Sequence, residues 1–195
     1  MPETQATPLT ELLHRSIDGD QHARDLAWQQ LHSELKVIAR NRLLREHRAE
    51  IQATELLHEA YLKLANNQLK PQDKSHFLAL ASVAMRQVLV DQARARRSQK
   101  RGGGLPPLTL VTQFEDPDSQ RSFDLIDVHE AIERLESFNA RKAQALVMSY
   151  FGGMSDTEVA HELAISTATV KRDLRMARAW LASELTGQVD KAIDG

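Results

Sequence analysis

The sequence lacks cysteine altogether, which excludes a disulfide framework, a thiolate metal site and a cysteine nucleophile. It also lacks any apolar run close to the roughly 20 residues that span a bilayer. Its first residues have neither the basic start nor the apolar core of a signal peptide, so we expect a cytoplasmic protein. With only eight glycines and six prolines, the chain is neither collagen-like nor wholly disordered.

Motifs for catalysis and for metal binding are missing as well. The pair His161–Glu162 has no second histidine at the spacing of a zinc protease helix, and the eight histidines are scattered. Arg101 precedes three glycines, but no Gly-Lys-Ser/Thr follows them, so this is not a phosphate-binding loop. There is no nucleophile elbow. We therefore expect no catalysis, no metal and no cofactor.

Helical periodicity, in contrast, covers most of the chain. Its 195 residues, 42% hydrophobic and 27% charged, suit one large domain or two small ones. Apolar residues recur at helical spacing over residues 9–17, 22–47, 53–65 and 76–97, and again from about 125 to 184. Ser75 is placed to cap the fourth of these helices. Because no convincing strand pattern is present, we expect an all-α fold of two small helical domains.

The net charge of −2 conceals an asymmetry along the chain. Residues 1–104 hold 16 basic and 12 acidic residues, whereas residues 105–195 hold 9 and 15. Between Arg86 and Arg101 there are six basic residues and one acid, and between Glu115 and Glu136 there are eight acids and two bases. Such local contrast indicates charged partners, although a solvated surface explains any one charge run equally well.

A stretch rich in glycine and proline separates the two expected domains. Residues 102–104 are glycines and residues 106–107 are prolines. These residues favour a flexible, mostly extended acidic linker over residues 102–124. The expected domains therefore occupy residues 1–101 and 125–195.

The most specific pattern lies between residues 152 and 181. Ser155 and Glu158 have the spacing of a capping box at the start of a helix over residues 156–163. A short turn follows, and Ser166 can cap a second helix that runs from 167 to about 185. An apolar stripe along this second helix is spaced for burial, and it consists of Val170, Leu174, Ala177 and Leu181. Two helices joined in this way form a helix-turn-helix.

The outer face of the second helix is polar and basic. In a helix-turn-helix that binds DNA, the second helix enters the major groove and its first turns reach base edges. A plain helical hairpin with a charged face is the alternative, but the turn spacing and the arginine positions favour DNA binding. The candidate DNA-binding residues are Ser166, Thr167, Thr169, Lys171, Arg172, Arg175 and Arg178.

Three segments resemble one family in their residues and in their order. The segment at residues 151–181, "FGGMSDTEVAHELAISTATVKRDLRMARAWL", resembles the domain-4 helix-turn-helix of sigma-70-type RNA polymerase sigma factors, and it is most similar to the extracytoplasmic-function (ECF) class. The segment "ATELLHEAYLKL" is similar to the domain-2 helix that docks on the polymerase clamp. The segment "HFLALASVAMRQVLVDQARARR" resembles the following helix, which reads and opens the −10 element. The resemblance covers about residues 9–185.

The resemblance implies partners and sites. Domain 2 is expected to bind core RNA polymerase, and domain 4 to bind the promoter −35 element; the polymerase contacts would be at its clamp and flap regions. Candidate polymerase-binding residues are Glu55, Leu56, His58, Glu59, Leu62 and Lys63. Candidate −10 residues, which would form a cationic groove and a base pocket, are Asn66, Asn67, Gln68, Arg86, Arg94, Arg96 and Arg97. For the three amides, ordinary loop capping is an equally good interpretation.

Two alternatives stay open at this point. The acidic stretch Glu115–Asp118 either threads toward the positive polymerase cleft as an RNA mimic or serves as a plain tether. The whole chain is either a promoter-specificity subunit or a free-standing helix-turn-helix regulator whose N-terminal domain senses a signal or dimerises. The second interpretation needs neither a clamp-docking helix nor a single-strand groove. An anti-sigma protein is a further expected partner.

One departure from the family pattern suggests regulation. Many ECF sigma factors carry an acidic Asp-Ala-Glu-Asp-like run just before the clamp-docking leucines, whereas residues 52–55 here read Gln-Ala-Thr-Glu. A phosphate on Thr54, at the N-terminus of the predicted helix, would supply negative charge and favour the helix dipole. We therefore expect a Ser/Thr kinase to activate the protein at Thr54. The alternative is that Thr54 merely caps the helix.

Overall fold

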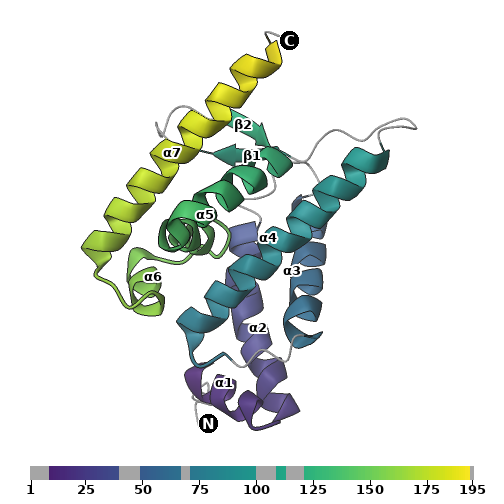
Figure 1. The fold of residues 1–195 in the computed structure, drawn as a ribbon. Coiled ribbons are helices and arrows are strands. Elements are labelled where there is room, and N and C mark those ends of the chain that lie inside the picture. The colour runs from purple at the N-terminus through teal and green to yellow at the C-terminus, as the bar shows by residue number, and fades with distance from the viewer. Residues whose placement is uncertain (1–8, 40–48, 67–70, 100–108, 113–120, 194–195) are drawn as a thin grey trace.

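The computed structural model describes residues 9–39, 49–66, 71–99, 109–112 and 121–193. Helices dominate this part of the chain, so the expected all-α fold is confirmed (Figure 1). The elements, in chain order, are α1 (Leu9–Ile17), α2 (Gln21–Ile38), α3 (Ala49–Asn66), α4 (Lys74–Gln99), β1 (Thr109–Thr112), β2 (Arg121–Asp124), α5 (Leu125–Tyr150), α6 (Asp156–Glu162) and α7 (Thr167–Ile193).

The N-terminal half of the molecule, α1 to α4, is built on apolar stripes that face inward. Leu12 and Leu13 of α1 pack with Ala23 and Ala27 of α2 in a small separate cluster. Trp28 links α2 to its neighbours, because its ring lies 4.4 Å from Tyr61 of α3 and 6.4 Å from Phe77 of α4, measured between centroids.

Helix ends differ from the sequence expectation more than helix positions do. The helix expected over residues 22–47 is confirmed as far as Ile38, and Leu43 lies outside the described residues. Helix α3 begins at Ala49, four residues earlier than expected. Helix α4 is capped by Asp73, whose carboxylate accepts the His76 backbone N–H at 2.9 Å, and not by Ser75. An aspartate is as good a cap as serine, so the sequence alone did not separate the two.

The C-terminal half consists of α5, α6 and α7. Helix α5 is two helical segments joined at Asn139, where the backbone is non-helical (φ −151°, ψ 75°). The Asn139 side chain then accepts the Lys142 backbone N–H at 3.2 Å, which starts the second segment. Helix α7 continues to Ile193, beyond the expected end near residue 185.

Sequence analysis found no convincing strand pattern, yet eight residues within the linker expected over residues 102–124 form two short strands. Strands β1 and β2 pair antiparallel, with Thr109 opposite Asp124 and Thr112 opposite Arg121. Threonine, valine and phenylalanine in these strands have high β-propensity, but four-residue runs are too short to give a clear alternation. The acidic stretch Glu115–Asp118 lies outside the described residues.

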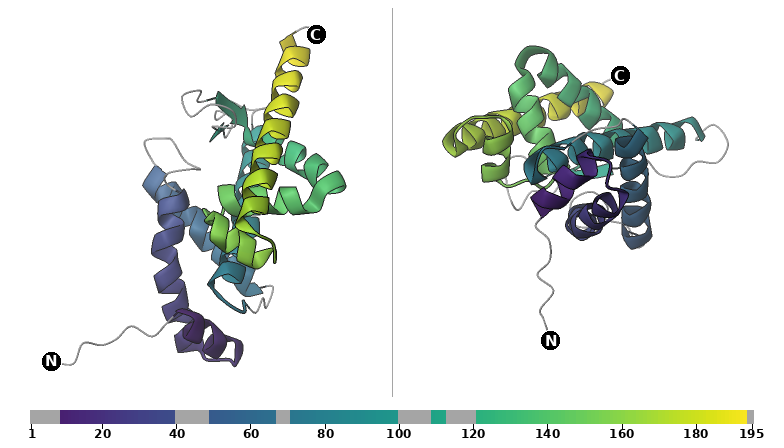
Figure 2. Two further views of the ribbon diagram at one scale, coloured as in Figure 1. Left: turned by 90° about the vertical axis from the view of Figure 1, so that its left-hand side faces the viewer. Right: turned by 90° about the horizontal axis from the view of Figure 1, so that it is seen from below.

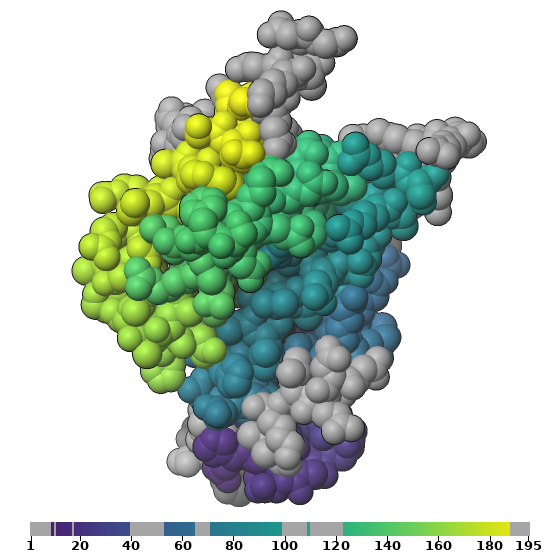
Figure 3. All heavy atoms as spheres, viewed as in Figure 1, coloured from purple at the N-terminus to yellow at the C-terminus, as the bar shows by residue number. Residues whose placement is uncertain are grey.

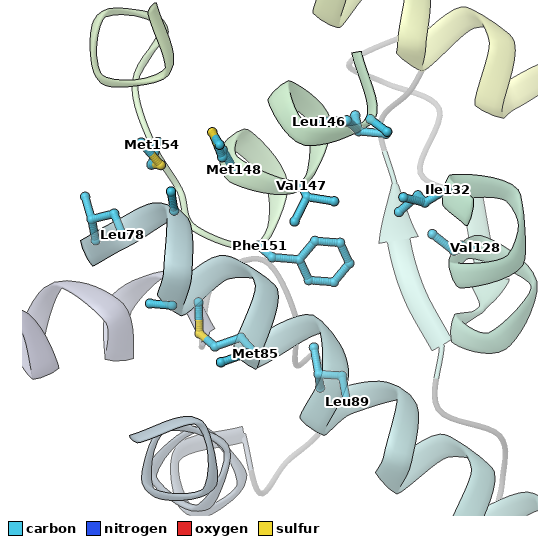
Figure 4. Close-up of a cluster of buried hydrophobic side chains, with 14 of the residues drawn as sticks. Leu78, Met85, Leu89, Val128, Ile132, Leu146, Val147, Met148, Phe151 and Met154 are labelled. Atoms are coloured by element: carbon cyan, nitrogen blue, oxygen red, sulfur yellow. The ribbon is translucent and has the colours of Figure 1, made fainter. Parts of the chain in front are cut away.

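The two halves share one hydrophobic core. Helix α4 lies between the α2–α3 pair and the α5–α6 segment (Figures 1 and 2). Figure 4 shows the Phe151 ring between Met85 and Leu89 of α4 on one side and Val128 and Ile132 of α5 on the other. Phe151 is 1% exposed. The expected helical units are therefore packed against each other in this structure.

Candidate nucleic-acid and polymerase interface

The first helix of the helix-turn-helix, α6, is fixed by the capping box expected from the sequence. The Ser155 hydroxyl accepts the Glu158 backbone N–H at 3.3 Å, and the Glu158 carboxylate accepts the Ser155 backbone N–H at 2.8 Å. Burial raises the pKa of Glu158, but these bonds and the Lys74 ammonium outweigh it and lower the pKa below its usual value. Glu158 thus stays ionised and holds the helix start in place.

The turn between α6 and α7 leads into a second serine cap. Ala164 has a φ of 51°, which reverses the chain after α6. The Ser166 hydroxyl accepts the Thr169 backbone N–H at 3.1 Å and lies 2.9 Å from the Thr169 hydroxyl. These two candidate DNA contacts are therefore engaged in starting α7, and they contribute to the site mainly by orienting it.

Helix α7 has the two faces that its sequence indicates. The expected apolar stripe, Val170 to Leu181, is between 0% and 4% exposed. The remaining candidates on the other face are all exposed, and their side chains form no ion pair with another described residue. This basic face of α7 comprises Thr167, Lys171, Arg172, Arg175 and Arg178.

A buried acid lies beneath this basic face. Asp173 of α7 has a side chain only 2% exposed, and its Oδ2 accepts a bond from Nε of Arg141 in α5 at 2.8 Å. Sequence reasoning missed both residues. The available signal was that Asp173 interrupts the apolar stripe between Val170 and Ala177, where a charge needs a buried partner.

The basic helix α4 divides into a free end and a covered middle. At its C-terminal end Arg94 and Arg97 are exposed and Arg96 is half-buried. Arg94 and Arg97 line a shallow recess with Ser98 of the same helix and Ile126 of α5. This end of α4 offers cationic groups that a nucleic-acid backbone can reach.

Arg86, in the covered middle of α4, is not placed to follow DNA. Its Nη2 and Nε lie 2.8 and 3.2 Å from Nδ1 of His129 in α5. Burial lowers the pKa of Arg86, and it also lowers the pKa of His129, whose ring faces the guanidinium. In this structure Arg86 is therefore an internal contact and is removed from the set of available DNA contacts.

The polymerase-binding candidates on α3 also divide by burial. Leu56 is 1% exposed and belongs to the core, so it is not available to a partner. Lys63 pairs with Asp91 of α4 at 2.9 Å. Helix α3 exposes the other four candidates, which are Glu55, His58, Glu59 and Leu62.

The remaining candidates are the three amides at residues 66–68 and the expected phosphorylation site, Thr54. Asn66 is the last residue of α3, but its side chain lies outside the described residues, as do Asn67 and Gln68. Thr54 is exposed in the second turn of α3 and not at its N-terminus. The expected support from the helix dipole is therefore wrong, because that effect is confined to the first turn. For the same reason Thr54 is not the helix cap.

The described residues offer neither a membrane span nor a metal site. None of the described helices is long and apolar enough to cross a membrane. The described part of the chain also contains no group of three or more metal-ligating side chains.

Comparison with known proteins identifies the family. The family model for ECF sigma factors matches residues 6–187, which include every described helix apart from the last turns of α7. The comparison with curated proteins gave no match. Because the family model covers both halves and the segment that joins them, this chain belongs to the ECF sigma factor family.

Proposed function

We propose that this protein is an alternative sigma factor that docks on core RNA polymerase through the exposed face of α3. The basic end of α4 then reads the −10 element, and the basic face of α7 reads the −35 element. The proposed units are residues 1–101 for polymerase and −10 binding, a linker over 102–124, and residues 125–195 for −35 binding. The main support is the basic face of α7, which is exposed and carried by a doubly capped helix-turn-helix.

The chemistry of α7 suits base and phosphate recognition. Arginine side chains form paired hydrogen bonds to guanine edges, whereas lysine and threonine suit phosphate oxygens. Arg172 and Arg175 are the candidates for base edges, and Thr167 and Lys171 the candidates for phosphates. A helix whose basic side chains are not already paired can offer them to DNA without breaking internal contacts.

Run-off transcription tests the proposed function. Core polymerase and genomic promoter fragments are incubated with and without this protein, and transcripts are sequenced. The proposal expects transcripts that appear only when the protein is present. If DNA is bound but no transcript depends on the protein under any condition, the free-standing regulator interpretation replaces it.

Docking is proposed to depend on phosphorylation of Thr54. Residues 52–55 contain a single acid, Glu55, where the family carries an acidic run. Thr54 and Glu55 are both exposed on α3, beside the other polymerase-binding candidates. A phosphate adds about −1.5 to −2 charge, which would restore attraction to a basic clamp surface. The unmodified protein would then dock weakly until a Ser/Thr kinase acts.

Polymerase binding by the wild type, Thr54→Ala and Thr54→Glu, with and without kinase treatment, tests this switch. We expect kinase treatment to tighten binding of the wild type and to leave Thr54→Ala unchanged. Ser33→Glu is a matched control, because Ser33 is exposed but lies on a different helix, α2. Equal affinity of the unmodified and phosphorylated wild type would rule the switch out.

A further inference from the structure

A recess lies between the middle of α4 and α5, apart from the basic face of α7 and the basic end of α4. Its volume is about 290 Å³, which is close to the lower end of the range for small-molecule sites, about 300–1,000 Å³. Figure 3 shows the two helices that form it, α4 in teal and α5 in green, side by side on the visible face. The proposed function makes no use of this recess.

Helix α5 forms two walls of the recess, one on each side of its bend at Asn139. Glu133 and Glu136 line the recess from the segment before the bend, and Ala143 and Val147 line it from the segment after the bend. Helix α4 is the third wall. Polar and apolar side chains thus face the same space from three directions, which is the usual make-up of a pocket for a small organic molecule.

Charged groups of opposite sign line one part of the recess. Arg86 comes from α4, and Glu133 and Glu136 come from α5. Burial lowers the pKa of Arg86, whereas the charges of Glu136 and then of Glu133 raise it, so both carboxylates act on the guanidinium. In the described part of the chain, however, no ion pair joins Arg86 to a carboxylate. The opposite charges therefore face one space without contacting each other.

Arg86 has hydrogen-bond donors, and Glu136 has acceptors, that no described residue uses. Nη2 and Nε of Arg86 lie 2.8 and 3.2 Å from Nδ1 of His129, which leaves three of the five guanidinium hydrogens without an acceptor among the described residues. The Glu136 carboxylate likewise forms no hydrogen bond or ion pair with another described residue. A molecule held between them must accept from Arg86 and donate to Glu136.

The remainder of the recess is apolar. Ala143, Val147 and Met148 line it and are buried, so they form its floor. Val83 of α4 also lines it and is 49% exposed, so it stands at the mouth. An apolar group that covers this floor is removed from water, which favours its binding.

The charges of the lining select the class of ligand. Because guanidinium only donates hydrogen bonds, the His129 ring accepts at Nδ1 and is neutral, so the lining has one positive and two negative charges. A simple anion would be repelled by the two carboxylates, and a simple cation would leave the donors of Arg86 unpaired. A zwitterion meets both needs, since arginine pairs well with a carboxylate and Glu136 accepts from an ammonium.

We propose that this recess binds a free α-amino acid with an apolar side chain. The carboxylate of the ligand lies against Arg86, its ammonium against Glu136, and its side chain over Val147 and Met148. At about 30 Å³ per water-sized group, the recess has room for roughly ten non-hydrogen atoms, which suits leucine or methionine. The site goes beyond the proposed function, because binding needs neither polymerase nor DNA.

Calorimetric titration of the purified full-length protein tests the site with four probes. Two are L-leucine and L-methionine. The third is isopentylamine, which is leucine without its carboxylate, and the fourth is isocaproate, which is leucine without its ammonium. We expect leucine or methionine to bind and to raise Tm, since the ligand contacts both α4 and α5. Each truncated probe should bind at least about tenfold more weakly than leucine, because it lacks one charged hydrogen-bonding group.

Two results of this titration would overturn the proposal. One is the absence of binding by both amino acids at concentrations up to about 10 mM. The other is an affinity for isopentylamine or isocaproate equal to that for leucine, which would identify the recess as a site for a simple cation or a simple anion.

A pair of charge variants tests the ammonium partner. Glu136→Gln keeps the shape of the side chain and removes its charge. Glu130→Gln is the matched control, because Glu130 is exposed on the same helix and does not line the recess. We expect leucine binding to weaken at least about tenfold in Glu136→Gln and to be unchanged in Glu130→Gln. An equal loss in both variants would contradict the placement of the ammonium at Glu136.

A pair of size variants tests the location independently of charge. Val83→Trp places a large side chain at the mouth of the recess, and Val37→Trp is its control, since Val37 is 57% exposed on α2. Both positions are exposed, so both variants are expected to fold, which circular dichroism verifies. Leucine binding should be lost in Val83→Trp and retained in Val37→Trp. Binding that persists unchanged in Val83→Trp would show that the amino acid binds elsewhere.

Discussion

Among the described residues, two ion pairs join α5 to α7, and they differ in how much water reaches the acid. The Asp173 side chain is 2% exposed where it meets Arg141, whereas Glu184 is 33% exposed where it meets Arg134. A buried carboxylate depends on its partner for solvation, and an exposed one does not. Because both pairs join the same two helices, replacing each acid in turn compares a buried ion pair with an exposed one.

Asp173→Ala is predicted to destabilise the protein by about 1.5–3 kcal/mol, the range for a hydrogen bond to a charged group. Glu184→Ala, on the same helix pair, should cost less than about 1 kcal/mol. Urea denaturation measures both. Equal effects of the two substitutions would show that Asp173 is not an anchor of α7.

Arg172 and Arg175 carry the prediction for −35 recognition. Arg172→Ala and Arg175→Ala should each weaken promoter DNA binding by about 1–3 kcal/mol if they contact bases. Polymerase binding should survive, since the exposed face of α3 is unchanged. Filter binding with promoter and mutated −35 sequences measures the loss, and Arg134→Ala on α5 is the control. Normal promoter use by both variants would mean that α7 is not the reading helix.

Sequence periodicity predicted the environment of single residues where their contacts are to residues three or four positions away. The stripe from Val170 to Leu181 and both serine caps follow from spacings of three and four residues, and the structure contains them. The partners Arg141 and His129 did not follow from the sequence, because they lie 32 and 43 residues from Asp173 and Arg86. No local pattern specifies such pairs.

At the scale of elements, helix centres were predictable and helix ends were not. An apolar stripe determines the middle of a helix, whereas the end depends on which of several possible capping residues makes the hydrogen bond. This explains why α4 starts at the Asp73 cap. Helix α3 likewise begins at Ala49, before the residue 53 at which the apolar pattern starts. The hairpin was missed because each strand is only four residues long.

The free end of α4 carries the prediction for −10 binding. Replacing Arg94, Arg96 and Arg97 by glutamine should slow open-complex formation and reduce its salt dependence. Each lost contact to single-stranded phosphate lowers the slope of log K against log salt by about 0.7. Arg24→Gln on α2 is the control. An unchanged slope in the triple variant would identify these arginines as solvated surface only.

At the scale of the whole molecule, the central finding is that two helical units form one core. Each unit alone follows from the sequence, but their contact depends on how the α5–α6 junction meets α4 at Gly152 and α2 at Gly153. In the sequence, a glycine pair before a helix is equally typical of an ordinary turn, so it does not indicate a contact between helices. The contact between the two halves therefore became visible only with the structure, and in it Arg86 is an internal contact and not a DNA contact.

Several charged groups face the His129 ring. Arg86 and Arg94 approach from α4, and Glu130 and Glu133 lie on α5 itself. Burial, followed by the Arg86 charge, lowers the pKa of His129 below its ordinary value of 6.5, although the two glutamates oppose the shift. The folded protein thus favours the neutral ring, whose Nδ1 accepts hydrogen bonds from Arg86. A protonated ring would lose that bond and repel the guanidinium.

Acidification is accordingly predicted to weaken the contact between α4 and α5 and to destabilise the protein. A group whose pKa is lowered by folding contributes full stability above its unfolded pKa, and this contribution declines as the pH falls from about 6.5 through the lowered value. The Tm should therefore fall over that range, and about 1 kcal/mol corresponds to about 2–4 °C in a chain of this size. His129→Gln supplies an acceptor for Arg86 that does not titrate, so this variant should lose the His129-dependent part of the response. If wild type and variant respond to pH identically, carboxylate protonation elsewhere explains the change and His129 does not control the contact between α4 and α5.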